Sequence, residues 1–467
     1  MLFNSAHFIV FFIIVTTAYF SLGLKGRLYL LLFASCYFYM VFRPIYILIL
    51  FFTIVIDYYA GIWIEQSTGS KRKLLLIISL ISNIGILAYF KYFNFLNQNL
   101  THLLGYFKVE NNIPFLEILL PIGLSFHTFQ AMSYTIEVYR GKQPAEQHFG
   151  VYALYVMFYP QLVAGPIERP QNILPQLKTF QKYDLENVKS GLLLMAWGLF
   201  KKVVIADRLA LFVDYAYNQP SEKNGLTLLM ATFFYTFQIY CDFSGYSDIA
   251  IGSARVMGYN LMENFKSPYF SGSISEFWRR WHISLSSWFR DYLYIPLGGN
   301  RKGITRKYLG LFLVFMVSGL WHGAKWTFVV WGSLHGIYLI LAALRQSLLP
   351  DFAISKSRLF SFLNVLATFI IVMFSWVFFR ASGIFDATQI FKKIAQLNFA
   401  DELPNIMNTN ELIFSFILIF ALLLKEKFYF SFRPLGSIQF GILFVFLLFL
   451  TYFLGVFSNQ QFIYFQF

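Results

Sequence analysis

The segment GLWHGAKW places His322 between two long apolar runs. A polar side chain at membrane depth is costly and by default marks a functional site. A glycine on either side of this histidine lets backbone or ligand come close, and Trp321 and Trp326 can shield it from lipid. A neutral imidazole in such surroundings can accept a proton from a hydroxyl at neutral pH. The pattern therefore indicates a catalytic base.

A second chemically rich stretch, residues 264–308, carries eight Lys or Arg and two acidic residues among aromatic ones. Ser273 and Glu276 have the spacing of a capping box, which predicts that a helix begins there. Apolar residues then recur at helical spacing, so residues 273–295 are expected to form an amphipathic helix. The segment is too charged to span a bilayer and should lie at the inner interface or dip into the protein. His282 flanks its apolar stripe.

Sequence motifs of other chemistries are missing from the chain. No GxSxG elbow, HExxH pair, Walker loop or GxGxxG is present. His282 and His322 alone would lack ligands for zinc, so no metal site is expected. A base without a protein nucleophile fits direct transfer, in which the base deprotonates an acceptor hydroxyl that attacks an activated acyl group.

Asp242 and Asp248 form an acidic pair in the otherwise apolar segment YCDFSGYSDIAIG. Two interpretations remain open: a hydrogen-bonded network between helices with Ser244 and Ser247, or a role in shaping a reaction chamber. For the five histidines besides 282 and 322, a structural role is the simpler interpretation: positions 7, 102 and 148 lie near the ends of apolar runs, and 127 and 335 lie within such runs.

The composition places the chain among all-α polytopic membrane proteins. Of 467 residues, 58 % are hydrophobic and 13 % charged, which is more apolar surface than a soluble core can bury. Apolar runs near the spanning length of about 20 residues recur from end to end. We expect one membrane domain over 1–467, with about 11 or 12 crossings plus re-entrant pieces. Candidate spans lie near residues 6–22, 28–42, 44–64, 74–92, 114–136, 149–165, 190–213, 226–256, 308–321, 326–344, 359–379, 411–424 and 439–457.

The distribution of charge predicts the orientation. The first basic residues, Lys25 and Arg27, follow the first apolar run, which leaves the N-terminus outside and argues against a signal peptide. The tail 458–467 would also lie outside. Basic loops on the inner face account for the net charge of +14 more simply than nucleic-acid binding does. The two cysteines lie in apolar runs and suggest neither a disulfide framework nor a metal cluster.

Four segments together carry a family resemblance: QLVAGPIERP, QIYCDFSGYSDIAIG, SEFWRRWHISLSSWFRDYLYIPLGGNR and SGLWHGAKWTFVVWGSLHG. The chain resembles the membrane-bound O-acyltransferase family, in the branch of the bacterial alginate O-acetyltransferases and their peptidoglycan and teichoic-acid relatives. The resemblance implies a ring of helices around a central chamber open from both faces. It also implies N-terminal spans over 1–140 and a catalytic core over 240–345.

The resemblance further implies the roles of the two histidines. His322 would be the catalytic histidine, and His282 would orient the acyl carbonyl or the acceptor. The donor would be cytosolic acyl-CoA, most simply acetyl-CoA, with no cofactor bound permanently. Only the acyl group would cross the cell membrane, and the chemistry would finish outside on an envelope polysaccharide through a partner of the SGNH hydrolase type.

The tail adds a further hypothesis. FIYFQF, residues 462–467, resembles a C-terminal motif of this branch in which a tyrosine carries the acyl group. Tyr464 would then enter the chamber from outside and become acylated. A phenol has a pKa near 10, against about 8.5 for a thiol, so a tyrosyl ester would keep much of a thioester's transfer potential. The alternative is an aromatic anchor at the membrane interface.

Basic residues of the amphipathic segment are candidates for attracting the phosphates of acyl-CoA, since their charge is complementary. These are Arg279, Arg280, Arg290, Arg301 and Lys302, with Trp321 as a further donor-side contact. The other interpretation is that these basic residues only set the orientation of the chain, as positive charge on the inner face does in membrane proteins generally.

At the level of the whole protein, a polysaccharide or lipid transporter and a scaffold for an external enzyme remain alternatives. Alginate, another exopolysaccharide, peptidoglycan and teichoic acid remain possible acceptors.

Overall fold

The computed structural model describes the whole chain except residues 118–119, 302, 349–356, 399–400, 405, 429–435, 458–461 and 464–467. Every regular element within the described residues is a helix, which confirms the all-α class. The chain divides into two compact units, one formed by residues 1–195 with 249–262 and the other by 196–248 with 263–467.

Seven described helical stretches are long and apolar enough to cross a membrane, which confirms a polytopic membrane protein. They are Pro44–Gln66, Gly69–Tyr106, Gly225–Val256, Ile304–His322, Trp326–Leu348, Arg358–Arg380 and Ser437–Leu454. The helix Ala6–Ser21 is apolar but shorter. The further crossings needed to reach 11 or 12 remain a prediction.

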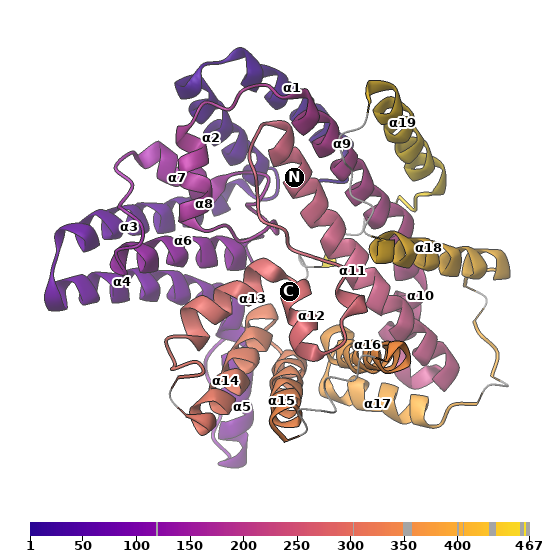
Figure 1. Cartoon of the computed structure of the whole chain (residues 1–467). Coiled ribbons are helices and arrows are strands. Elements are labelled where there is room, and N and C mark those ends of the chain that lie inside the picture. The colour runs from indigo at the N-terminus through magenta and orange to yellow at the C-terminus, as the bar shows by residue number, and fades with distance from the viewer. Residues whose placement is uncertain are drawn as a thin grey trace. The chain divides into compact units, whose positions relative to one another are not determined.

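In the first unit, three helices lie side by side (Figure 1): α3, α4 and α6. A buried polar network links α3 to α4: Ser79 Oγ–H and Asn83 Nδ2–H donate to the Asp57 carboxylate at 2.6 and 2.8 Å. Such interhelical hydrogen bonds satisfy polar groups that lipid cannot. The helices of this unit are α1 Ala6–Ser21, α2 Leu24–Met40, α3 Ile47–Gln66, α4 Gly69–Leu87, α5 Phe93–Tyr106, α6 Leu124–Tyr139, α7 Phe149–Met157 and α8 Pro170–Lys178, with the first part of α9 Leu185–Phe200 and the end of α11 Gly225–Val256.

Two expected spans in this unit are shorter than predicted. The run 149–165 is helical only as far as Met157 in α7, after which the chain turns through Pro160 and Gly165. The run 114–136 is helical only from Leu124, directly after Gly123, which has a positive φ of 78°. Residues 150–165 are buried, as their apolar character predicted, but residues 114–117 are mostly exposed. At both places turn residues override apolar character as a predictor of helix.

The second unit holds the long apolar hairpin α14–α15 (Figure 1) and the two short helices that precede it. Its helices are the remainder of α9 and α11, α10 Asp207–Asn218, α12 Ile274–Arg280, α13 Ile283–Phe289, α14 Ile304–His322, α15 Trp326–Leu348, α16 Arg358–Arg380, α17 Ile384–Ala395, α18 Thr409–Phe428 and α19 Ser437–Leu454. Between α9 and α10 the chain continues as a π-helix, Lys201–Ala206.

The expected continuous helix over 273–295 is wrong. The predicted start is confirmed, since Ser273 Oγ accepts the Glu276 N–H at 3.2 Å. The helix then breaks between α12 and α13, where His282 has φ +44° in the left-handed region. A period of apolar residues does not reveal this break, because both short helices bury the same kinds of side chain.

Candidate active site

The two histidines singled out in the sequence meet in the second unit. His322 is the last residue of α14, and His282 precedes the first turn of α13. Their ring centroids lie 6.5 Å apart, and both side chains are buried. A substrate atom between two imidazoles at this separation would lie within hydrogen-bond reach of both.

The backbone break at His282 is stabilised by the segment that precedes α12. Ile283 N–H donates to Asn264 O at 2.9 Å, and Lys266 N–H donates to Arg280 O at 2.9 Å. These bonds pair the two backbone groups that a continuous helix would have used internally. A left-handed conformation at a non-glycine residue is uncommon and concentrates at functional sites.

Asn264 also orients the His282 ring. Its Oδ1 accepts the Ser284 N–H at 3.3 Å and the Ser284 Oγ–H at 2.9 Å. Because a backbone N–H can only donate, this atom of Asn264 is the oxygen. His282 Nδ1 lies 3.0 Å from the same oxygen and must donate to it, so Nδ1 carries the proton.

The protonation state of His282 follows from its surroundings, outside the seven candidate spans. Burial first, and the neighbouring His322 second, lower the pKa of His282 well below the value of a free imidazole. The ring is therefore neutral at pH 7, with its lone pair on Nε2. Sequence analysis missed Asn264. The only sequence signal for Asn264 is that it lies ten residues ahead of α12.

Aromatic rings form the wall around His322. Trp331 and Phe379 lie edge-on to its imidazole at 5.3 and 5.4 Å between centroids. Trp376 stacks on Trp331 at 5.6 Å. Trp326, expected to shield the histidine, is 56 % exposed. Trp331 follows Trp326 by five residues and lies on a buried part of α15, so the segment supplies a shield one turn later than expected.

Two glycines let α14 and α15 pack backbone against backbone at this point. A Cβ at Gly319 would collide with the backbone oxygen of Phe328, and one at Gly332 would collide with that of Phe315. Small residues at helix crossings permit this close approach in membranes. Gly319, three residues before His322, therefore allows α15 to pack closely against α14, and the position of His322 depends on this helix crossing.

Two of the four expected donor-side arginines line a cavity. Arg279 and Arg290 border a space of about 320 Å³ between α12, α13, α14 and α15, which extends to Ser318, one turn before His322. Arg290 is also paired with Asp291 at 2.8 Å. Arg280 instead forms an ion pair with Glu276 at 2.6 Å, one helical turn away. Lys302 lies outside the described residues.

A buried charged cluster surrounds the first residue of the acidic pair. Lys202 Nζ lies 2.6 Å from Asp242 Oδ1 and 2.8 Å from Asp207 Oδ1. The second residue, Asp248, is paired with Lys201 at 2.8 Å. Asp242 and Asp248 therefore belong to a network between helices, as one interpretation had it, with lysines as partners. Two adjacent lysines inside the apolar run GLFKKVVIA were the signal that the sequence analysis passed over.

Tyr464 lies outside the described residues. Its neighbour Ile463 lines a second cavity, of about 200 Å³, together with Lys202, Asp242, Phe328 and Phe379 among others. This cavity is polar, and Phe379 connects it to the His322 wall.

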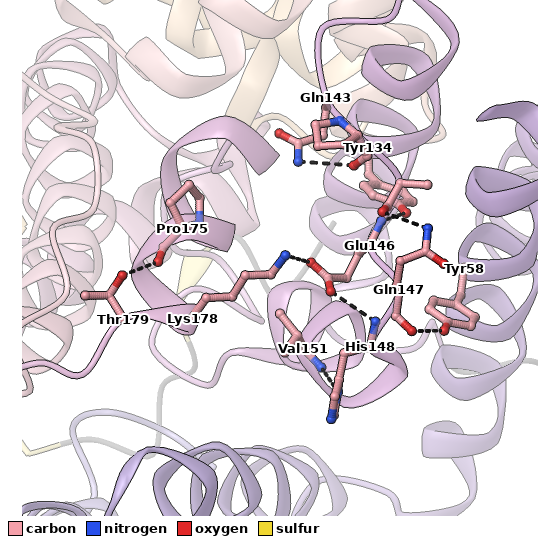
Figure 2. Close-up of polar contacts among 12 residues, drawn as sticks. Tyr58, Tyr134, Gln143, Glu146, Gln147, His148, Val151, Pro175, Lys178 and Thr179 are labelled. Atoms are coloured by element: carbon pink, nitrogen blue, oxygen red, sulfur yellow. Dashed lines mark hydrogen bonds and ion pairs between the residues drawn. The ribbon is translucent and has the colours of Figure 1, made fainter.

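Three of the remaining histidines have ordinary structural contacts. Figure 2 shows His148 at the start of α7, where its ring accepts the Val151 N–H at 3.3 Å. His7 bonds to the Tyr37 hydroxyl at 2.8 Å, and His335 Nδ1 accepts from Trp278 at 3.3 Å. These three contacts support a structural role for His7, His148 and His335.

His127 differs, since neither ring nitrogen has a hydrogen-bond partner among the residues that the structure describes. Within those residues no group of three or more His, Cys, Asp or Glu is arranged to hold a metal ion.

The chain is similar to known proteins over most of its length. A model of the MBOAT, membrane-bound O-acyltransferase family, matches residues 30–384. A probable alginate O-acetylase of Pseudomonas putida is 39 % identical over 408 residues, which is 86 % of this chain and 81 % of the relative. A peptidoglycan O-acetyltransferase of Helicobacter pylori is 35 % identical over 432 residues, covering 85 % and 80 %. A teichoic acid D-alanyltransferase of Bacillus subtilis is 29 % identical over 233 residues, covering 47 % and 58 %.

Proposed function

Since the chain belongs to the membrane-bound O-acyltransferase family, we propose that it transfers an acetyl group from cytosolic acetyl-CoA for the O-acetylation of an alginate-like envelope polysaccharide. The similarity to several probable alginate O-acetylases supports the acceptor class. The observation that carries the proposal is the buried pair His322–His282, 6.5 Å apart and oriented through Asn264.

His322 acts as the general base. It takes the proton of the acceptor hydroxyl as the oxygen attacks the thioester carbonyl carbon. The carbon–sulfur bond breaks, CoA leaves as its thiolate, and the imidazolium returns the proton to that sulfur. General acid–base catalysis by a correctly positioned side chain raises a reaction rate about 10²–10⁴-fold.

His282 positions the reactants through Nε2. Because Nδ1–H is used toward Asn264, the neutral ring offers a hydrogen-bond acceptor on its other nitrogen. That atom can hold a hydroxyl or an amide N–H, such as those of the acceptor or the pantetheine arm. It cannot donate to the acyl carbonyl in this tautomer, and the one proton of the reacting hydroxyl goes to His322. We therefore infer that His282 holds a different donor, either a second hydroxyl of the acceptor or an amide N–H of the pantetheine arm.

The donor enters along the cavity bordered by Arg279 and Arg290. Two guanidinium groups suit the phosphates of CoA, and the cavity's extent to Ser318 supports a route for the pantetheine arm toward His322. Trp321, half-buried next to His322, is a candidate contact at the inner end of this route.

Tyr464 is the proposed carrier of the acetyl group toward the outer face. His322 would take the phenol proton, the phenolate would attack the thioester, and the CoA thiolate would leave with that proton. The neighbouring Ile463 lines the polar cavity, and Phe379, which also lines that cavity, contacts the His322 ring; both observations support this proposal. A partner of the SGNH hydrolase type would then move the acetyl group from Tyr464 to the polysaccharide.

Replacing His322 tests the proposal. In purified, membrane-reconstituted protein, His322→Ala should lower acetyl-CoA-dependent release of CoA thiol at least about 10²-fold, because the base is lost. The protein should still fold and insert. His148→Ala, which alters the cap of helix α7 in the first unit, is the matched control.

The alternatives predict other results. A transporter would lose substrate movement independently of acetyl-CoA, and a scaffold would be unaffected by His322→Ala. Full CoA release by that variant would overturn the enzymatic role.

Peptidoglycan is a second candidate acceptor. It is favoured by the peptidoglycan O-acetyltransferase relative, which matches nearly as much of the chain as the alginate relatives do. Mass spectrometry of acetyl esters on each envelope polymer, in cells with and without this chain, decides between the two. Esters lost only from the peptidoglycan would reject an alginate-like acceptor.

A further inference from the structure

The Lys202–Asp242 pair is among the most buried charged groups of the described chain. The side chains of Lys202 and Asp242 are 1 % and 2 % exposed. Removing two charges from water is unfavourable and can outweigh their mutual attraction, so such a pair is weak evidence for a purely stabilising role. Its contacts therefore call for a separate explanation.

Those contacts are with the C-terminal segment. Asp242 Oδ1 faces Lys202, while its other oxygen, Oδ2, accepts the Ile463 backbone N–H at 2.8 Å. The Phe462 ring lies over the Lys202 ammonium at 4.6 Å and edge-on to Tyr246 at 4.8 Å. Each member of the ion pair thus contacts one of two adjacent tail residues, Lys202 the Phe462 ring and Asp242 the Ile463 amide, which is 221 positions along the chain from Asp242.

The helix that carries Lys202 also contacts the chain leading to the tail. Lys201–Ala206 is a π-helix, a form that often occurs at functional sites and leaves backbone carbonyls available. Val203 O accepts the Val456 N–H at 2.8 Å, just after α19. The segment is therefore bound to one short stretch of helix both before and after residues 458–461.

The anchored residues lie at the edge of the polar cavity. Ile463 lines it together with Asp207, Tyr235 and Gln238. Within the described part of the chain, Asp207 Oδ2, Tyr235 Oη and Gln238 Oε1 are buried and have no hydrogen-bond partner. Buried polar atoms are normally paired, so these three mark a space built to receive a polar group.

We propose that Lys202 and Asp242 are positioning residues, forming a buried latch that holds the C-terminal segment by the Ile463 amide at this cavity. The latch rests on the proposed function in one respect: the tail that it holds through residues 462 and 463 is the one that carries the acetyl group in that proposal. Neither side chain touches the reacting atoms. The anchoring itself is a separate claim and is measured separately.

Hydrogen exchange of the tail tests the anchoring in the full-length protein in nanodiscs. In Asp242→Asn, an NH2 group replaces one of the two carboxylate oxygens, so only one of the two positions that face Lys202 and the Ile463 N–H can still accept a hydrogen bond. The Ile463 amide, followed by mass spectrometry of the C-terminal peptide, should exchange about tenfold or more faster than in the wild type.

The chain provides a matched control on the same helix. Asp248 pairs with Lys201, whose Nζ also donates to Ser244 Oγ at 2.8 Å, and the contacts described for this pair do not reach residues 462–463. Asp248→Asn should leave tail exchange at the wild-type rate. An unchanged rate in Asp242→Asn, or an equal acceleration in Asp248→Asn, overturns the latch.

A second variant leaves the buried charges intact. Ile463→Pro removes the donor N–H and leaves Lys202 and Asp242 in place, so it tests the same contact even if Asp242→Asn folds poorly. Each single variant should lower kcat for acetyl transfer about tenfold with the KM for acetyl-CoA unchanged, and the double variant should be no worse than the poorer single one. A full additive loss in the double variant contradicts a shared contact.

The outcomes separate the latch from the proposed function. Faster tail exchange with an unchanged kcat, while His322→Ala is inactive, rejects the positioning role and leaves the acyltransferase intact. An active His322→Ala rejects the proposed function, and the Ile463 exchange rate still decides whether the tail is anchored.

Discussion

The His282 ring is restricted by a single side-chain oxygen. Asn264 Oδ1 accepts two hydrogens from Ser284 and a third from His282 Nδ1. One atom therefore selects both the tautomer and the orientation of a buried imidazole. Misplacing a reacting group by about 1 Å can cost about 10²-fold in rate, so the support of His282 matters as much as its presence.

Asn264→Ala should lower kcat for acetyl transfer by about 10²-fold, because the His282 ring loses the acceptor that orients it. Folding should be retained, as judged by size-exclusion chromatography in detergent. Ser284→Ala is the control: it removes one donor to Asn264 but leaves the bond to His282. Wild-type kcat in Asn264→Ala would show that the protein orients His282 by other means.

At the scale of elements, the site depends on a helix crossing and a helix break. Gly319 and Gly332 allow α14 and α15 to touch through their backbones, which places His322 beside the Trp331 ring. The break between α12 and α13 places His282 opposite. The distance between His282 and His322 therefore depends on both the helix crossing and the helix break.

Gly332→Ala should destabilise the protein by about 1–3 kcal/mol, the usual cost of overpacking, since the added methyl collides with the backbone of α14. It should also reduce acetyl transfer. The measurement is thermal unfolding in detergent. Gly441→Ala is the matched control, because a Cβ there meets no atom within 4 Å. Equal unfolding temperatures for the two variants would contradict the close crossing.

At the scale of the whole molecule, the basic residues assign the faces of the membrane. The helical stretch Gly69–Tyr106 is 38 residues long and follows the expected inner loop. At 1.5 Å per residue it is longer than a bilayer core of about 30 Å, so its two ends should lie on opposite faces. The positive-inside rule places the end near Lys71 in the cytoplasm.

Cysteine labelling checks this orientation. With Cys36 and Cys241 replaced by serine, a cysteine at Ser70 should react with a membrane-impermeant maleimide only after the cells are opened. A cysteine at Glu110, which is exposed beyond the far end of the helix, should react in intact cells. The reverse pattern would invert the proposed direction of transfer.

Much of the site was predictable from residue types. His322 stood out because a polar side chain at membrane depth is costly and glycines flank it, His282 because it flanks an apolar stripe, and the start of α12 followed from Ser273. The break at His282 was not predictable, since it depends on bonds from Asn264 and Lys266 to the backbone on either side. Those residues carry no periodic signal that a sequence pattern can detect.

The sequence by itself determined the class of protein and the costly polar residues, because composition and length are properties of the chain alone. Only the tertiary structure decided which of those residues meet. The Ile463 amide reaches Asp242 across 221 residues, and His282 meets His322 within 6.5 Å. Such pairings arise from how buried helices pack and where they break, and these depend on contacts between segments that are far apart along the chain.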